Sequence, residues 1–177
     1  REIAEEGEFA ISVRGLEGAL RALTEQIPLP EAEDLTKALL RMLDTALLEE
    51  RYQVATGIVR GVRNSGQPRP LIVDWMDEVV SEARFRQATA AFNHPQATQE
   101  TRGSVLEYFR ACGPWAVEPM LAMIPSIGDT QLRHAISGLL VEVGITNLEP
   151  VKALLEHEQA FVAREAVYLL AHLSSED

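Results

Sequence analysis

The side chains that could carry metal or nucleophilic chemistry in this chain are four histidines and one cysteine. The histidines are spread along the sequence, at His94, His134, His157 and His172. A zinc site on a helix needs two imidazoles at positions i and i+4 and a third ligand, and no two of these histidines have that spacing. Cys112 has no base nearby in the sequence to activate a thiolate. We predict solvent-facing or capping histidines, an inert buried thiol, and neither a metal nor a cofactor.

Motifs of enzymatic catalysis are also missing from the sequence. The segment Gly15–Gly18 has too few glycines for a phosphate loop or a dinucleotide fingerprint, and no nucleophile-elbow motif occurs. The sequence therefore predicts a protein that is not an enzyme.

Four arginines form the main candidate binding patch outside the repeats described below: Arg51, Arg60, Arg63 and Arg69. No acidic residue occurs between positions 51 and 73. Arg60 and Arg63 are three residues apart, so they share one face of a helix. The patch could bind an acidic protein or a phosphate backbone. The alternative is a solvated helix face that balances the segment 1–34, which holds nine acids and three arginines.

The two tryptophans have different expected roles. Trp75 lies on an apolar stripe with Ile72 and Val79, which favours a place in the core over an interface anchor. Trp115 follows Gly113 and Pro114 at a predicted helix start. An exposed tryptophan beside a groove is typical of a binding hot spot, so Trp115 is a candidate partner-binding residue.

Arginine also recurs at a constant interval, between positions i and i+31, as Arg102, Arg133 and Arg164. Repetition at such a period is typical of stacked helical hairpins. Equal spacing would align the three guanidinium groups in a row that could bind an acidic or phosphorylated ligand. We favour a structural role, in which a planar guanidinium bridges adjacent turns through carboxylate and carbonyl oxygens.

The elements that must position these residues are all helices. Apolar residues at helical spacing, bounded by turn residues, predict helices over 9–27, 31–48, 50–63, 70–81, 82–93, 97–112, 115–125, 130–143, 147–157 and 159–173. No alternation of period two is long enough to predict a strand. The expected fold class is therefore all-α.

Further columns share the interval that separates Arg102 from Arg133. They are Val105, Ile136 and Val167; Tyr108, Leu139 and Leu170; Gly113 and Gly144; and the pairs Glu118-Pro119 and Glu149-Pro150. The two glycines fall where a helix C-terminus favours a positive φ. The chain from Arg102 onwards thus predicts repeated antiparallel hairpins, which must stack because one hairpin cannot bury its apolar stripe alone.

These columns resemble HEAT or HEAT-like repeats, including the short type of phycobilin-lyase relatives, over residues 82–177. The resemblance implies an α-solenoid of about nine or ten helices, with 1–177 as a single repeat domain and 1–81 as divergent hairpins. It also implies that Asp129, in the turn before an arginine of the repeat, pairs with Arg133. Solenoids of this kind usually bind other macromolecules.

Bulk properties narrow the possible partners. The net charge of −11 disfavours nucleic-acid binding, because nucleic-acid phosphates are negative. No apolar run is long enough for a membrane helix, and the single cysteine fits a reducing cytoplasm. A start at Arg1 suggests a segment of a longer protein. We expect a scaffold that binds another protein or other domains of its parent chain. The alternatives are a nucleic-acid or phosphate-binding module using the arginines of 51–69, and an oligomerisation domain.

Overall fold

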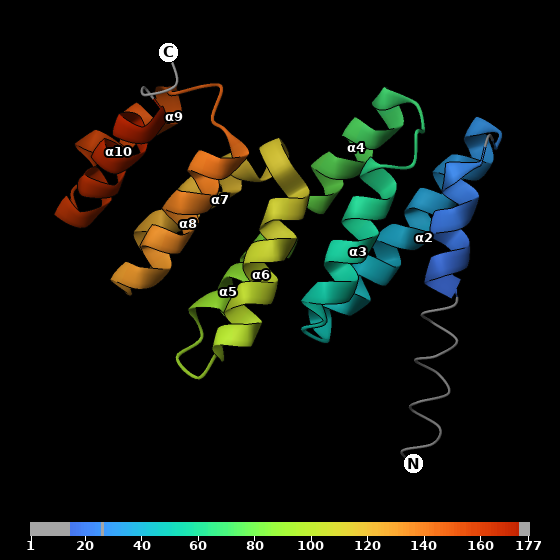
Figure 1. Ribbon diagram of the computed structural model, residues 1–177, viewed down its shortest axis with the longest axis horizontal. Helices are drawn as coiled ribbons and strands as arrows, with labels where there is room; N and C mark the ends of the chain where they lie inside the picture. Colours follow the sequence, from blue (N-terminus) through green and yellow to red (C-terminus); the bar gives the residue numbers. More distant parts are fainter. Residues whose placement is uncertain (1–14, 26, 174–177) are drawn as a thin grey trace. The chain divides into compact units, whose positions relative to one another are not determined.

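Helices make up the regular structure of this protein (Figure 1). The structure is a computed structural model, and it describes residues 15–25 and 27–173. No strand occurs in these ranges, so the predicted all-α class is confirmed for them. Of the first predicted helix, residues 15–24 are helical, and its predicted start at 9–14 lies outside the described residues.

The chain divides into two compact units, between Val79 and Val80. The first contains the helical segment 15–24 and the helices α2 (Leu29–Leu48), α3 (Tyr52–Arg63) and α4 (Arg69–Val79). The second contains α5 (Glu82–Asn93), α6 (Gln99–Cys112), α7 (Val117–Met123), α8 (Thr130–Val143), α9 (Glu149–Ala153) and α10 (Ala160–Leu173). Short 3-10 helices adjoin α7 and α9: η1 (Gly113–Ala116), η2 (Ile124–Ser126) and η3 (Leu154–Glu156).

The first unit buries the apolar stripes predicted for its helices. The helices α2 and α3 pack together, and Leu39, Leu43 and Ile58 have no exposed surface. Trp75 of α4 lies in this core, as predicted, and its indole Nε1 donates a hydrogen bond of 2.9 Å to the carbonyl of Thr36 in α2. This bond satisfies the one polar atom of the ring and fixes α4 against α2.

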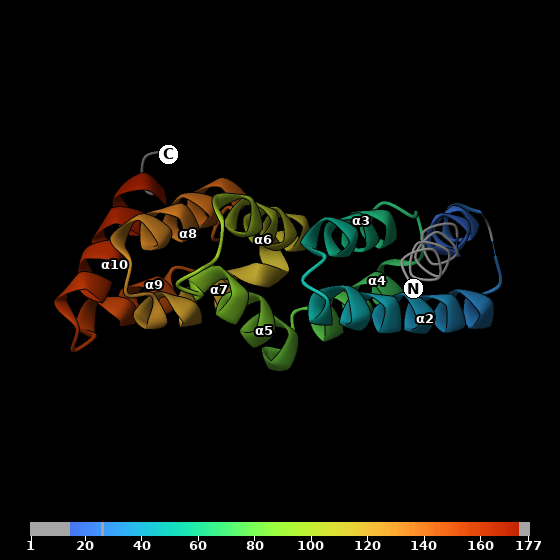
Figure 2. The ribbon, with the colours of Figure 1, turned by 90° about the horizontal axis from the view of Figure 1, so that it is seen from below.

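The second unit arranges its helices in two layers. Figure 2 shows α6 and α8 in one layer and α5, α7 and α9 in the other. Along the first layer α6 contacts α8, and α8 contacts α10. The side chains between the helices form the core of the unit, and the fully buried ones include Phe92, Val105, Tyr108, Phe109, Met120, Ile124, Ile136 and Leu140.

Equivalent positions of the repeat end and begin the helices of the second unit. Gly113 and Gly144 follow α6 and α8 with φ of 61° and 80°, which confirms the positive φ predicted for both. Thr98 and Asp129, which are separated by the same interval as the two glycines, are the N-caps of the same two helices. Each side-chain oxygen accepts hydrogen bonds from backbone N–H groups of the first turn. The interval that separates Arg102 from Arg133 therefore also separates the N-caps of α6 and α8 and the glycines that follow these two helices.

Candidate functional site

Two arginines of the repeat hold the chain segments that precede their helices. The Nη1 of Arg133 donates to the carbonyls of Ile127 and Gly128, at 2.7 and 2.8 Å. Arg102 donates in the same way to the carbonyls of Phe92 and His94, at 3.3 and 3.4 Å. Backbone carbonyls at a helix end or turn need such donors, because they have no partner within a helix. These contacts are the ones that a structural role requires.

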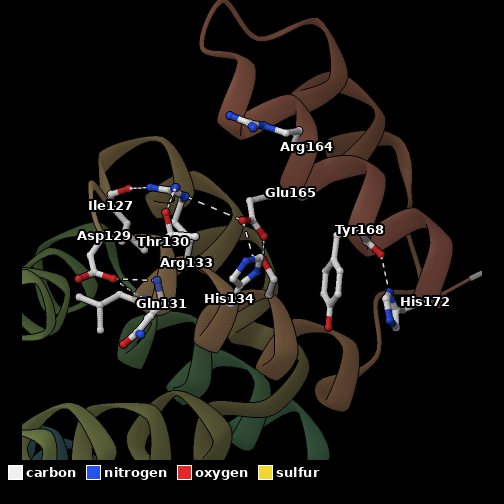
Figure 3. Close-up of polar contacts among 12 residues, drawn as sticks. Ile127, Asp129, Thr130, Gln131, Arg133, His134, Arg164, Glu165, Tyr168 and His172 are labelled. Carbon is white, nitrogen blue, oxygen red and sulfur yellow. Dashed lines mark hydrogen bonds and ion pairs between the residues drawn. The ribbon is translucent and has the colours of Figure 1, made fainter.

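Arg133 is also part of a buried polar cluster between α8 and α10 (Figure 3). Glu165 of α10 is only 4% exposed, and it accepts a hydrogen bond of 2.9 Å from the Ser137 hydroxyl. Its other oxygen lies 3.9 Å from Nε of Arg133 and 3.5 Å from Nδ1 of His134. The ring of Phe161 lies 4.3 Å from the guanidinium carbon of Arg133. A carboxylate buried to this degree is tolerated only with such partners, so the cluster fixes α10 against α8.

Asp129 does not form the pair with Arg133 that the resemblance implied. Its carboxylate caps α8 instead, and accepts from the N–H groups of Gln131 and Leu132 at 2.7 and 3.2 Å. The acid that approaches Arg133 is Glu165, from the following hairpin. The N-terminus of α8 takes the Asp129 carboxylate because its first N–H groups lack partners and carry partial positive charge.

A second charged link joins the preceding pair of helices. Arg110 of α6 donates to both carboxylate oxygens of Glu142 in α8, at 2.6 and 2.8 Å. This hydrogen bonding lowers the pKa of Glu142 and raises the pKa of Arg110. The sequence separation of Arg110 and Glu142 equals that of Arg133 and Glu165. Each link thus joins one helix of the layer to the next.

The third arginine of the repeat is placed differently. Arg164 is exposed, and its Nε donates to the carbonyl of Ala160 in its own helix at 3.4 Å. In Figure 3 its side chain lies apart from the cluster around Glu165. The three arginines of the repeat therefore do not share one environment.

A groove in the second unit lies between α5 and α7. Its volume is about 500 Å³, which is within the usual range for ligand pockets. The apolar lining comes from Val80, Phe85, Pro119, Ala122 and Met123. Phe85 is held from behind by the ring of Phe109 in α6, stacked at a centroid distance of 4.5 Å. The lining is therefore fixed by the core of the unit.

Polar side chains surround this groove, and the acidic ones outnumber the basic ones. Glu82 and Arg86 form an ion pair along α5, whereas Glu118 of α7 is exposed and has no basic partner among the described residues. Thr89 places its hydroxyl 3.7 Å from the sulfur of Met123. Ser126 bonds to the Met123 carbonyl at 2.7 Å. The groove thus combines an apolar lining with a net negative rim.

The four arginines of 51–69 lie at the two ends of α3 and at the start of α4. Arg51 precedes the helix, and its Nε lies 3.1 Å from a carboxylate oxygen of Glu49. Arg60 and Arg63 occupy the last turn, where cations complement the helix dipole. Arg69 begins α4. Twelve residues of helix span about 18 Å, so Arg51 is separated from Arg60 and Arg63.

The histidines take local roles. Nδ1 of His94 accepts from the N–H of Gln96 at 3.2 Å, and Nδ1 of His157 accepts from the N–H of Gln159 at 3.1 Å. His172 bonds at 2.8 Å to a carbonyl one turn earlier in α10. The described residues contain no group of three or more His, Cys, Asp or Glu side chains that could hold a metal ion.

The remaining candidates lie in or near the core. Cys112 is buried, as predicted, and Trp115 is half-buried in η1. Tyr52 is buried at the start of α3, where burial raises the pKa of its phenol to about 12 and the Glu50 carboxylate adds to the rise. The phenol therefore keeps its proton at neutral pH.

Sequence reasoning missed Glu165 and the residues of the groove. Glu165 is adjacent to Arg164 in sequence, and it follows Arg133 at the same separation at which Glu142 follows Arg110. That shared separation was a signal that could have identified it. Phe85 and Met123 come from helices that are separated by α6. No spacing in the sequence places these two side chains together.

Comparisons with protein-family models, curated proteins and solved structures find no match to this chain. None of the helices in the described part of the chain is both long and apolar enough to cross a membrane.

Proposed function

We propose that this chain is a non-enzymatic helical-repeat module that binds a partner protein, with the groove between α5 and α7 as its main binding surface. We further propose that its second unit is a piece of an α-solenoid of the HEAT-like type. The constant interval between equivalent caps, glycines and arginines supports this architecture. The groove is the observation that carries the function.

The chemistry of the groove indicates what would bind there. The accessible apolar lining comes from Val80, Pro119 and Ala122, and an apolar side chain of a partner could pack on it. Phe85 and Met123 complete the lining but are only 3% and 5% exposed. Glu118 gives the rim an exposed carboxylate with no basic partner among the described residues. The partner segment should therefore carry an apolar anchor and, beside it, a lysine or arginine. A basic partner also suits a chain with a net charge of −11, which attracts cations at long range.

The test compares two matched substitutions in affinity capture with the full chain as bait. Ala122 is exposed in α7 and lines the groove, so Ala122→Glu adds bulk and charge to the proposed surface. Ala153 is exposed in α9 and does not line the groove, so Ala153→Glu is the control. We expect one protein to be retained by the wild type and by Ala153→Glu, and to be lost with Ala122→Glu.

A charge reversal gives a second measurement on the same surface. Glu118→Lys should weaken binding of the captured protein, and the loss should shrink at high salt because an exposed ionic contact is screened. Circular dichroism and thermal unfolding of each variant check that the fold is unchanged. Equal retention of the captured protein by wild type and both groove variants would refute the proposal.

A further inference from the structure

The groove between α5 and α7 runs along both helices for about two turns. Its lining residues in α5 are three or four apart, and those in α7 fall on one face in the same way: Glu82, Phe85, Arg86 and Thr89, and Glu118, Pro119, Ala122 and Met123. The seven steps from Glu82 to Thr89 advance about 10 Å along the helix axis. The groove therefore has the length of a short helical segment.

The two ends of the groove differ in chemistry. Thr89, in the second half of α5, has its hydroxyl 3.7 Å from the sulfur of Met123, the last residue of α7. Glu82 and Glu118 lie in the first turns of the same two helices. The two helices run in the same direction, since opposite directions would place these acids about 18 Å apart along the axes, beyond the length of the groove. The carboxylates thus lie at one end, and the hydroxyls of Thr89 and Ser126 at the other.

The walls of the groove favour a helical occupant over an extended one. Both walls are helices, whose backbone N–H and C=O groups are bonded within the helix. An extended peptide would leave its own backbone groups without partners over the apolar lining formed by Val80, Pro119 and Ala122. A helix satisfies its backbone internally and makes contact through the side chains of one face. Two such side chains, at positions i and i+4, match the length of the groove.

The charges specify the polar residue of the occupant and its place. Arg86 neutralises Glu82 within α5, whereas Glu118 has no basic partner among the described residues. A lysine or arginine of the occupant would supply that partner at the acidic end of the groove. Cations are favoured in the last turn of a helix. The occupant would therefore run antiparallel to α5 and α7, with its C-terminal end at the acids.

We infer that the groove binds an amphipathic helix antiparallel to α7, with apolar side chains at i and i+4 over Ala122 and Pro119 and a lysine or arginine at i+7 or i+8 beside Glu118. This inference rests on the proposed protein-binding function, and it adds the conformation, spacing and direction of the bound segment. Anchors one turn apart are the pattern of helix-in-groove recognition.

The probe is a messenger-RNA-displayed library of random peptides of about 16 residues, enough for four turns of helix. The library is first depleted on immobilised Ala122→Arg protein, which carries bulk and a repelling charge in the groove, and is then selected on the wild-type full chain. We expect the enriched peptides to share the predicted spacing of two apolar residues and one basic residue. By fluorescence anisotropy, such a peptide should bind Ala122→Arg at least about tenfold more weakly than the wild type. Ala153→Arg, at an exposed position outside the groove, should leave the affinity unchanged.

Three further changes test conformation and direction. A proline between the two apolar anchors of the peptide should weaken binding at least about tenfold, whereas alanine at the same position should not. A peptide whose basic residue is replaced by glutamate should bind the wild type poorly and regain affinity for Glu118→Lys. The matched control is Ser126→Lys, which places the same charge at the other end of the groove and should give no rescue. Circular dichroism of each protein variant checks that the fold is unchanged.

Several outcomes would overturn the inference. They are no enriched peptide after depletion, enriched peptides without the predicted spacing, an affinity that proline does not change, or rescue by Ser126→Lys in place of Glu118→Lys. Enriched peptides that depend on Ala122 but are not helical would remove this inference alone, because the groove would still bind a protein segment. Equal capture of the partner protein by the wild type and the groove variants would remove the proposed function as well.

Discussion

The helices α8 and α10 carry the same repeat pattern but meet different surroundings. In α8, Arg133 and Ile136 are buried, because α10 lies against that helix. In α10, the equivalent Arg164 and Val167 are exposed, and no helix among the described residues follows. The comparison shows that the repeat fixes the type of residue in a column. The neighbouring helix determines whether that residue contributes to stability.

The largest expected difference concerns the two arginines. Arg133→Ala should lower the free energy of unfolding by about 3–5 kcal/mol, because it leaves the Glu165 carboxylate buried without its guanidinium. Arg164→Ala should change the free energy of unfolding by less than about 0.5 kcal/mol, since the side chain is exposed. Urea denaturation of both variants measures the difference. Equal losses would mean that burial does not distinguish the two positions.

The apolar column should show the same contrast with a smaller effect. Ile136→Ala removes a fully buried side chain and should cost about 2–5 kcal/mol. Val167→Ala affects a side chain that is 57% exposed, and should cost less than about 0.5 kcal/mol. Thermal and urea unfolding of the full chain test both values. A large loss from Val167→Ala would show that this side chain is covered in solution.

Two glycines, one directly after α8 and one inside it, provide a further test of the repeat. Gly144 has a φ of 80° and a ψ of 123°, which residues with a Cβ rarely adopt, so Gly144→Ala should destabilise the protein by about 1–3 kcal/mol through backbone strain. Gly138 lies within α8, is exposed, and has nothing within 4 Å of an added Cβ. Gly138→Ala should therefore stabilise by about 0.5–1 kcal/mol through helix propensity. Opposite signs in unfolding experiments would confirm that the column of Gly113 and Gly144 is a backbone requirement.

The smallest expected effect concerns the exposed link between α6 and α8. Arg110 lowers the pKa of Glu142 in the folded state, so the pair adds stability above the ordinary glutamate pKa of about 4.3 and loses it as the pH falls through the lowered value. Glu142→Gln should cost less than about 1 kcal/mol at pH 7, because both side chains are exposed to solvent. In urea denaturation the difference from the wild type should shrink as the pH falls below the ordinary glutamate pKa, and it should vanish only once the pH is below the lowered pKa of Glu142. A difference that persists at low pH would contradict this assignment.

Much of the local structure could be predicted from the sequence. The breaks at Asn64–Pro68 and Gly113–Pro114, together with the apolar spacing, were enough to predict the helices, because helix formation depends on short-range pattern and turn chemistry. The positive φ at Gly113 and Gly144 followed from their shared position after a helix. The core placement of Trp75 followed from its apolar stripe.

The contacts between helices were harder to predict. The resemblance assigned Asp129 to Arg133, but the free N–H groups of α8 take that carboxylate, and Glu165 approaches Arg133 instead. The arginines of 51–69 were considered as one patch, although α3 separates Arg51 from the rest. A capping oxygen and an ion-pair oxygen are chemically alike. Only the packing of the helices decides which role each acid takes.

The sequence alone determined that this protein is built of helices and where most of them begin and end, and it set the constant interval of the repeat. These properties depend on neighbouring residues and on backbone preference. Only the tertiary structure decided that Glu165 is buried, that Phe85 and Met123 line one groove, and that Val167 is exposed where Ile136 is not. Burial depends on which helices lie against each other, and residues far apart in the chain establish those contacts.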